Sequence, residues 1–322
     1  MTDVLDLTNS HLRDLSSVGI APTLTALDLT ANRLETLDPR VQALTGLCAL
    51  NLRQNIIADA ASVNCCQCKG ALQDLELRDN LLTAIPTLEG FSKLTRLEFS
   101  YNQIRSLAPL SSLAAEPASS PPLVELFVAA NKVTAIEALG GFSQLTVLEL
   151  GSNRIRTIEG LEGQASLLEL WLGRNRISKI ENLGHLTALR RISLQSNRLE
   201  NMSGIAACSS LVELYLSHNG IWCLDKQLTQ LMALRVLDVS NNRISKVEHL
   251  QGLSRLEDLW LNDNQIPSLE GMQQALQDQV ESLTTIYLEN NPAASAPDYK
   301  QRMLALLPKL QQLDANVLPE RD

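Results

Sequence analysis

Three closely spaced cysteines are the residues whose types and spacing suggest chemistry first. Cys65, Cys66 and Cys68 occur in the stretch VNCCQCKG. Thiolates at such spacing can bind zinc or take part in redox chemistry. A structural zinc site needs four ligands, usually two separated pairs, but the sequence has no second cysteine pair and no histidine nearby. We therefore expect packed or loop thiols on the convex side and no metal or cofactor, with redox sensitivity or weak metal binding as the alternative.

The remaining polar residues do not form a catalytic constellation. The four histidines (His11, His185, His218 and His249) are scattered and have no nucleophile partner in a recognisable motif. No glycine-rich phosphate-binding loop occurs, and the acidic residues are spread along the chain as they are on solvated surfaces. The sequence therefore predicts a protein that is not an enzyme.

Composition restricts the partners and the compartment. The 322 residues carry a net charge of −9, which argues against binding to a nucleic acid backbone. No run of about 18 apolar residues occurs, so we expect no membrane span. The start MTDVLDLTNSHL lacks the basic and apolar regions of a secretory signal. We expect a cytosolic or nuclear protein with reduced thiols.

One pattern recurs along almost the entire chain and predicts the fold. The pattern LxxLxLxxNxL repeats most often every 22 residues, which is typical of leucine-rich repeats. Its first copy has Ser10 at the asparagine position, and the others have Asn32, Asn55, Asn80, Asn102, Asn131, Asn153, Asn175, Asn197, Asn219, Asn242, Asn264 and Asn291. We predict an α/β solenoid of about thirteen repeats, with parallel strands on the concave face.

Each repeat position has a physical role. In the stretch LLELWLGRNRI, Leu167, Leu170, Leu172 and Ile177 point into a core shared with neighbouring repeats. The asparagine turns the chain, and its amide binds backbone groups that the turn leaves unpaired. We assign residues 1–291 to the solenoid, with a loop insertion at 108–122, and residues 292–322 to a C-terminal cap. A longer convex helix is expected within 271–282.

Trp171 lies between two core leucines, so strand alternation places it on the concave face. The equivalent positions are Asp6, Asp28, Asn51, Glu76, Glu98, Phe127, Glu149, Trp171, Ser193, Tyr215, Asp238, Trp260 and Tyr287. Five of these are aromatic, although aromatics make up only 3% of the chain, and six are acidic. Strand propensity alone is one explanation of the aromatics. We favour a protein-binding face, where exposed aromatics supply much of the binding energy.

The later repeats resemble a particular family. The stretches LELGSNRIRTIEGL, LWLGRNRISKIENL, LQSNRLENMSGI and LYLSHNGI, with the closing PDYKQRMLALLPKLQQLDA, resemble the leucine-rich-repeat regulatory subunits of protein phosphatase 1, of the regulatory subunit 7 type. The resemblance covers residues 140–315 most closely and the earlier repeats more weakly.

The resemblance implies a function and a binding site. It implies a non-catalytic subunit that binds the phosphatase catalytic subunit through the concave face and controls its activity or maturation, together with a second phosphatase inhibitor in a ternary complex. It also implies a role in mitosis and a chain that is monomeric when free. The family's contact positions fall here on Glu98, Phe127, Glu149, Trp171, Asp238, Asp258, Trp260 and Tyr287.

A different function remains compatible with the same fold. An assembly scaffold of the axonemal or splicing type would have the same leucine core and bind a different protein. The series of aromatics with interleaved acids distinguishes the two hypotheses, because a scaffold would share the core but has no reason to keep that series.

Overall fold

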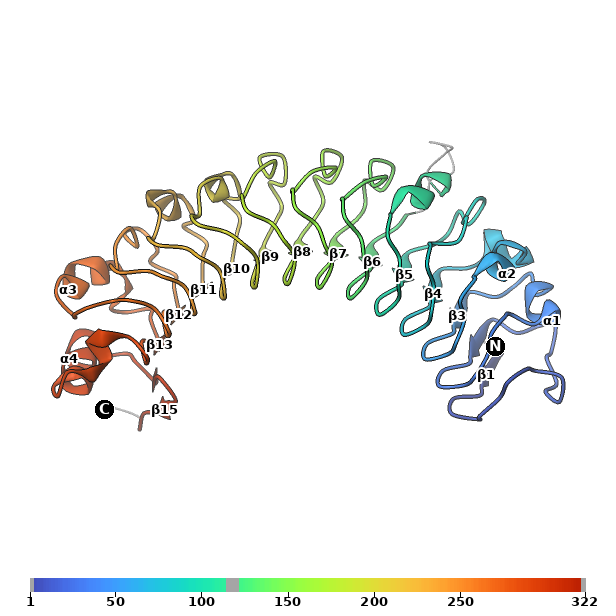
Figure 1. Ribbon diagram of the computed structural model, residues 1–322, viewed down its shortest axis with the longest axis horizontal. Coiled ribbons are helices and arrows are strands. Elements are labelled where there is room, and N and C mark those ends of the chain that lie inside the picture. The colour runs from blue at the N-terminus through green and yellow to red at the C-terminus, as the bar shows by residue number, and fades with distance from the viewer. Residues whose placement is uncertain (1–2, 114–121, 320–322) are drawn as a thin grey trace. The chain divides into compact units, whose positions relative to one another are not determined.

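The computed structural model describes residues 3–113 and 122–319. The chain divides into two compact units. The first comprises Met1–Ile155 and Glu159–Leu167, and the second comprises Arg156–Ile158 and Leu168–Asp322. Both are parallel-strand leucine-rich-repeat solenoids, as the repeat predicted. In each unit the strands lie on one side and the short helical segments on the other (Figure 1).

The strands of the first unit are each three residues long and pair in parallel with their sequence neighbours. They are β1 (Val4–Asp6), β2 (Ala26–Asp28), β3 (Ala49–Asn51), β4 (Asp74–Glu76), β5 (Arg96–Glu98), β6 (Glu125–Phe127) and β7 (Val147–Glu149). The register is constant, so equivalent residues of consecutive repeats lie side by side.

The second unit continues the same pattern. Its strands are β8 (Glu169–Trp171), β9 (Arg191–Ser193), β10 (Glu213–Tyr215), β11 (Val236–Asp238), β12 (Asp258–Trp260), β13 (Thr285–Tyr287), β14 (Gln312–Leu313) and β15 (Asn316–Val317). The pairs from β8 to β14 are parallel, whereas β15 returns antiparallel to β14. The thirteen strands from β1 to β13 correspond to the thirteen predicted repeats.

Leucine burial explains why the strands form where they do. The middle residue of a strand and the residue after its end point inward, as Leu170 and Leu172 show by having no exposed surface. Leu167 and Ile177 are equally buried, as predicted. Burying one such side chain contributes about 1.5–3 kcal/mol, so the repeated leucines supply most of the drive to stack.

The predicted asparagine ladder is present in both units. In the first unit, the side-chain amide of Asn55 donates to the carbonyls of Leu29 (2.9 Å) and Leu52 (3.0 Å), and Asn55 Oδ1 accepts from Leu34 N (3.0 Å). Each buried amide therefore ties its own turn to the preceding repeat. A leucine at this position could not satisfy those backbone groups.

The sharpest turn lies one residue before the asparagine. Gln54 in the first unit and Ser196 in the second have φ of 53° and 55°. Such left-handed backbone is unfavourable for residues other than glycine. The hydrogen bonds of the following asparagine hold the turn in place and offset that cost.

Short helical segments form the side opposite the strands. In the first unit they are α1 (Pro39–Gln42), α2 (Ala61–Asn64), η1 (Gln67–Gly70) and η2 (Ala108–Ser112). In the second they are η3 (Ile205–Ala207), η4 (Lys226–Gln230), α3 (Met272–Ala275), η5 (Gln277–Gln279), η6 (Pro292–Ser295) and α4 (Tyr299–Leu306). A repeat of 22 residues leaves room for little more than one helical turn on this side.

Two predicted segments differ in detail. The helix expected within 271–282 is divided into α3 and η5 at Leu276, whose backbone (φ −107°, ψ 13°) is not helical. Beyond it, Gln279 is buried and its Nε2 donates to Leu250 O (2.8 Å). The insertion at 108–122 begins with the turn η2, whose Leu110 is fully buried, so its first residues are not an extruded loop. Residues 114–121 lie outside the described part of the chain.

The residues after Asn291 cover the last leucine-rich repeat. Helix α4 buries Tyr299 and Met303. The Tyr299 hydroxyl donates to Asp314 Oδ2 (2.9 Å), and Asp314 Oδ1 accepts from Leu288 N (2.7 Å). Asp314 thus binds backbone groups at the end of the stack, where no further asparagine follows. The division into a solenoid and a cap at residue 291 stays a prediction.

Candidate functional site

The strand face of the first unit carries the predicted column in continuous register. The third residue of each strand pairs with the third residue of the following strand, from Asp6 opposite Asp28 to Phe127 opposite Glu149. Glu98, Phe127 and Glu149 occupy consecutive strands at the end of this series. The structure therefore brings these three predicted site residues together on one surface.

Arg96 organises the carboxylates of this face. Its guanidinium lies 3.1 Å from Asp74, 3.0 Å from Glu76 and 3.6 Å from Glu98. The same group lies 5.2 Å from the centre of the Phe127 ring. Arg96 also lies 3.6 Å from Glu125 on the strand of Phe127, so one arginine contacts acidic side chains on three strands and an aromatic ring. These contacts restrict the rotamers of those side chains before any partner arrives.

Glu149 differs from the acids around Arg96 because its carboxylate forms no ion pair with that arginine. Its Oε1 accepts a hydrogen bond from Gly151 N at 2.9 Å. Burial raises its pKa to about 7, and repulsion from Glu98 adds to the rise. Burial and the charge of Glu98 also raise the pKa of Glu76. A basic group from a partner would remove this penalty, because an opposite charge favours the ionised carboxylate.

The strand face of the second unit begins with an ordered aromatic pair. The rings of Trp171 and Tyr215 stack with centres 6.4 Å apart. Trp171 Nε1 donates to Glu169 (3.1 Å), and the Tyr215 hydroxyl donates to Glu213 (2.8 Å). Arg191 lies between the two glutamates, 2.8 Å from Glu169 and 2.6 Å from Glu213 Oε1, and 5.7 Å from the Trp171 ring centre.

The remaining predicted residues lie together further along this unit. Asp238, Trp260 and Tyr287 are directly paired on three consecutive strands, and Asp258 is the first residue of the same strand as Trp260. Trp260 is 36% exposed and meets Tyr287 edge to face, with ring centres 5.7 Å apart. Asp238 is buried, and its Oδ1 accepts from Ser240 N (3.0 Å) and Ser240 Oγ (2.7 Å).

Sequence reasoning missed the arginines of these faces. Arg96 and Arg191 occupy the first position of their strands, two residues before the column position, and alternation places both positions on the same face. Asp258, which came from the family resemblance, occupies the same position of its strand, and strand alternation was not applied to the other strands. Applied throughout, it would also have found Glu169 and Glu213 beside the aromatic pair.

Comparison with known proteins assigns the family. The model of the leucine-rich repeats (2 copies) family matches residues 209–252 and 233–274. A protein of Arabidopsis thaliana described as protein phosphatase 1 regulatory inhibitor subunit PPP1R7 homolog is 48% identical over 318 residues. That alignment covers 98% of this chain and 94% of the plant protein. The chain belongs to the PPP1R7 family.

Solved structures similar to this PPP1R7-family chain support the fold alone. An internalin (inlF) from Listeria monocytogenes has a TM-score of 0.82 at 23% identity, covering 99% of this chain and 88% of the internalin. A leucine-rich-repeat protein from Leptospira interrogans has a TM-score of 0.70 at 23% identity, covering 96% and 94%. Identity this low carries no information on partners.

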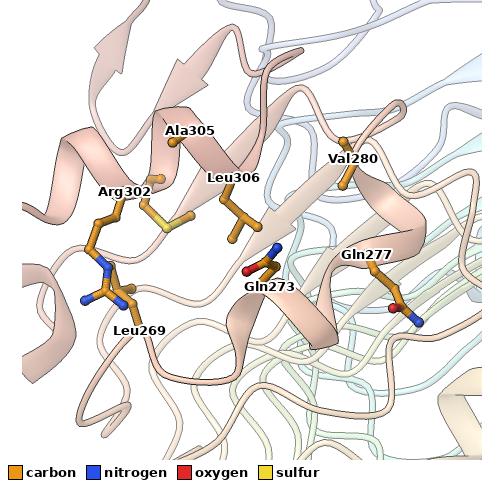
Figure 2. A pocket seen from close by; sticks show the side chains of 8 residues that line it. Leu269, Gln273, Gln277, Val280, Arg302, Ala305 and Leu306 are labelled. Atoms are coloured by element: carbon orange, nitrogen blue, oxygen red, sulfur yellow. The ribbon is translucent and has the colours of Figure 1, made fainter.

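A cavity on the helical side of the PPP1R7-family chain is a different kind of feature. It measures about 570 Å³ and lies between the segment α3–η5 and helix α4 of the second unit (Figure 2). Leu269, Val280 and Leu306 give it apolar walls, and Gln273, Gln277 and Arg302 line it with polar groups. It lacks the paired titratable groups that catalysis needs.

The cysteine cluster lies in the first unit, away from the strand face. Cys66 and Cys68 are buried and Cys65 is exposed, so two of the three are packed thiols, one of the two forms that the sequence predicted. The hydrogen bond with Cys68 and, next, burial raise the pKa of the Cys66 thiol, which keeps it protonated. Within residues 3–113 and 122–319, no group of three or more His, Cys, Asp or Glu side chains is placed to hold a metal ion.

Proposed function

We propose that this PPP1R7-family chain is a non-catalytic subunit that binds the protein phosphatase 1 catalytic subunit and controls its activity or maturation. The observation that carries the proposal is the pair of ordered strand faces. On each, aromatic and acidic side chains are held by a central arginine in the same register as the repeats. The relative from Arabidopsis thaliana, described as a phosphatase 1 regulatory inhibitor subunit, supports the choice of partner.

The contact residues follow from the two faces. The first unit offers Glu98, Phe127 and Glu149, and the second offers Trp171, Asp238, Asp258, Trp260 and Tyr287. Partly exposed tryptophan and tyrosine are typical energetic anchors of interfaces, and the acids would steer a basic surface of the phosphatase toward them. A second phosphatase inhibitor in a ternary complex, action in the cytoplasm and nucleus, and a role in mitosis are further parts of this proposal.

Co-precipitation with a purified phosphatase 1 catalytic subunit, followed by an activity assay on the captured complex, tests the proposal. We expect stable capture and altered phosphatase activity at equal catalytic subunit concentration. Capture without any change in activity or catalytic-subunit stability would favour the scaffold hypothesis, and absence of capture would reject phosphatase binding itself.

In the part of the chain that the structure describes, no helix is long and apolar enough to cross a membrane.

A further inference from the structure

The residues that follow the ladder asparagines form a separate surface in the second unit. We call Arg176, Arg198, Gly220, Trp222 and Arg243 the arginine flank. Backbone hydrogen bonds of 2.8 Å join Arg198 N to Ile177 O, Gly220 N to Leu199 O, and Arg243 N to Ile221 O. These bonds place the residue after each asparagine beside its counterpart in the next repeat, about 5 Å away.

The side chains of this flank point to solvent. The residue two positions after each asparagine is fully buried, as Ile177, Leu199, Ile221 and Ile244 show. Arg176, Arg198 and Arg243, which precede such residues in extended backbone, are exposed. Trp222 follows Ile221 and is 60% exposed, a larger fraction than either tryptophan of the strand faces.

The arginines of the flank are not neutralised within the chain. Among the described residues, Arg176, Arg198 and Arg243 take part in no ion pair, in contrast to Arg96 and Arg191 on the strand faces. The flank side of each repeat consists of the residues one and three positions after the asparagine. In these four repeats, Glu200 is the one carboxylate at such a position. A positive row is therefore open to solvent on a chain whose net charge is −9.

Gly220 interrupts the row without a structural need for glycine. Its backbone is outside the left-handed region occupied by Gly204 and Gly252. A Cβ atom at Gly220 would meet only Leu199 O, at 3.4 Å, which is an ordinary contact. The fold would thus accept a side chain here. Its absence leaves a gap between Arg198 and Arg243, next to the exposed Trp222.

We propose that the arginine flank binds an extended acidic segment of a partner protein, with one apolar side chain in the gap at Gly220 against Trp222. Unpaired arginines match carboxylates in charge and geometry, and a solvent-exposed tryptophan supplies the apolar anchor. A nucleic acid is disfavoured as the occupant, because binding to a phosphate backbone relies on more clustered Lys and Arg side chains than the three arginines of the flank. This surface uses positions other than the strand-face column, so it does not depend on the proposed phosphatase site.

The test uses the full chain and a fluorescein-labelled, glutamate-rich peptide with a single central leucine. Fluorescence anisotropy at low salt should show saturable binding that weakens as salt is added. Arg198→Glu and Gly220→Gln should each weaken binding about tenfold or more, the first by charge reversal and the second by filling the gap with an uncharged side chain. Urea unfolding checks that both variants fold like the wild type.

Matched controls separate this surface from the others. Arg255→Glu makes the same charge change at an exposed position in the next repeat, and Trp260→Ala alters the strand face, so both should bind the peptide like the wild type. Absence of binding by the wild type, or equal weakening by Arg255→Glu and Arg198→Glu, would overturn the proposal. Tighter binding of oligothymidylate than of the peptide, lost in Arg198→Glu, would assign the flank to nucleic acid instead.

Discussion

Leu259 and Trp260 are neighbours in one strand but have opposite roles. Leu259 has no exposed surface, whereas Trp260 is 36% exposed and contacts Tyr287 on the strand face. The alternation of the strand separates the leucine core from the strand face at every repeat. Large apolar side chains on this face are therefore available to a partner and are not required to fill the core.

Substitution of these two residues should have very different effects on the free energy of unfolding. Leu259→Ala should lower the free energy of unfolding by about 2–5 kcal/mol, because it leaves a cavity in close-packed surroundings. Trp260→Ala should lower it by less than about 1 kcal/mol, since it removes mainly surface contacts. Urea unfolding followed by circular dichroism measures both values. Equal destabilisation by the two variants would show that the tryptophan belongs to the core.

Glu149 should make stability depend on pH. Burial raises its pKa from 4.5 to about 7 in the folded chain, so the folded state binds more protons than the unfolded state between these values. Its contribution to stability is complete below the unfolded pKa and is lost as pH rises through the folded pKa. Glu149→Gln should therefore stabilise the chain by about 1–3 kcal/mol more at pH 8 than at pH 5. A difference that does not change with pH would contradict this assignment.

The cysteines should respond to substitution according to burial. Cys68→Ser places a hydroxyl in a fully buried position and should cost about 1–3 kcal/mol of unfolding free energy. Cys65→Ser, at an exposed position, should change it by less than about 0.5 kcal/mol. Because Cys68 is buried and Cys65 is exposed, Cys68 is the position of the two that is sensitive to substitution. Thermal unfolding of the single variants tests the order.

The repeat is held together by two different kinds of interaction. Leucines stack the repeats without direction, and the asparagine amides fix the turn and the register. In the second unit, Asn197 donates to Leu172 O and Leu194 O, both at 3.0 Å, and accepts from Ile177 N at 2.9 Å. These bonds tie two consecutive repeats together through a half-buried side chain.

Removing one ladder amide should therefore destabilise both repeats. Asn197→Ala leaves Ile177 N without its hydrogen-bond partner and removes one of the two amide donors to Leu172 O and to Leu194 O. It should cost about 1–3 kcal/mol of unfolding free energy. The exposed neighbour Gln195 provides the control, and Gln195→Ala should cost less than about 0.5 kcal/mol. Urea unfolding gives both values, and hydrogen exchange should show faster exchange at Ile177 N in the first variant. An Asn197→Ala variant as stable as the control would show that the asparagine hydrogen bonds do not stabilise the fold.

The 22-residue spacing was sufficient to predict the strands, their parallel register and the asparagine ladder, because these follow from one pattern repeated many times. It was not sufficient for the helical side, where the non-helical backbone of Leu276 divides a segment that composition alone favoured as one helix. The ion pairs of Arg96 and Arg191 were also missed. These ion pairs form between side chains of neighbouring repeats. Only the third residue of each strand was compared in the sequence, so the first residues, which form the pairs, were not included.

At the scale of the whole molecule, both units are built from the same repeat. The strand faces and the arginine flank are surfaces of different character. The strand faces combine acids and aromatics with one central arginine each, whereas the arginine flank of the second unit is basic. Membership of the PPP1R7 family, at 48% identity over 98% of the chain, makes the phosphatase 1 catalytic subunit the partner to test on the strand faces. The separation of the surfaces allows each to be altered independently.

Titration calorimetry with the purified phosphatase 1 catalytic subunit tests the central claim most directly. The wild-type chain should bind, and Trp260→Ala should raise the Kd by about thirtyfold or more, which corresponds to about 2 kcal/mol of binding free energy. Met232→Ala removes an apolar side chain that is 66% exposed outside the strand-face column, and it should leave the Kd within about twofold. Absence of binding by the wild type, or equal affinities of a correctly folded Trp260→Ala variant and the wild type, would contradict the account.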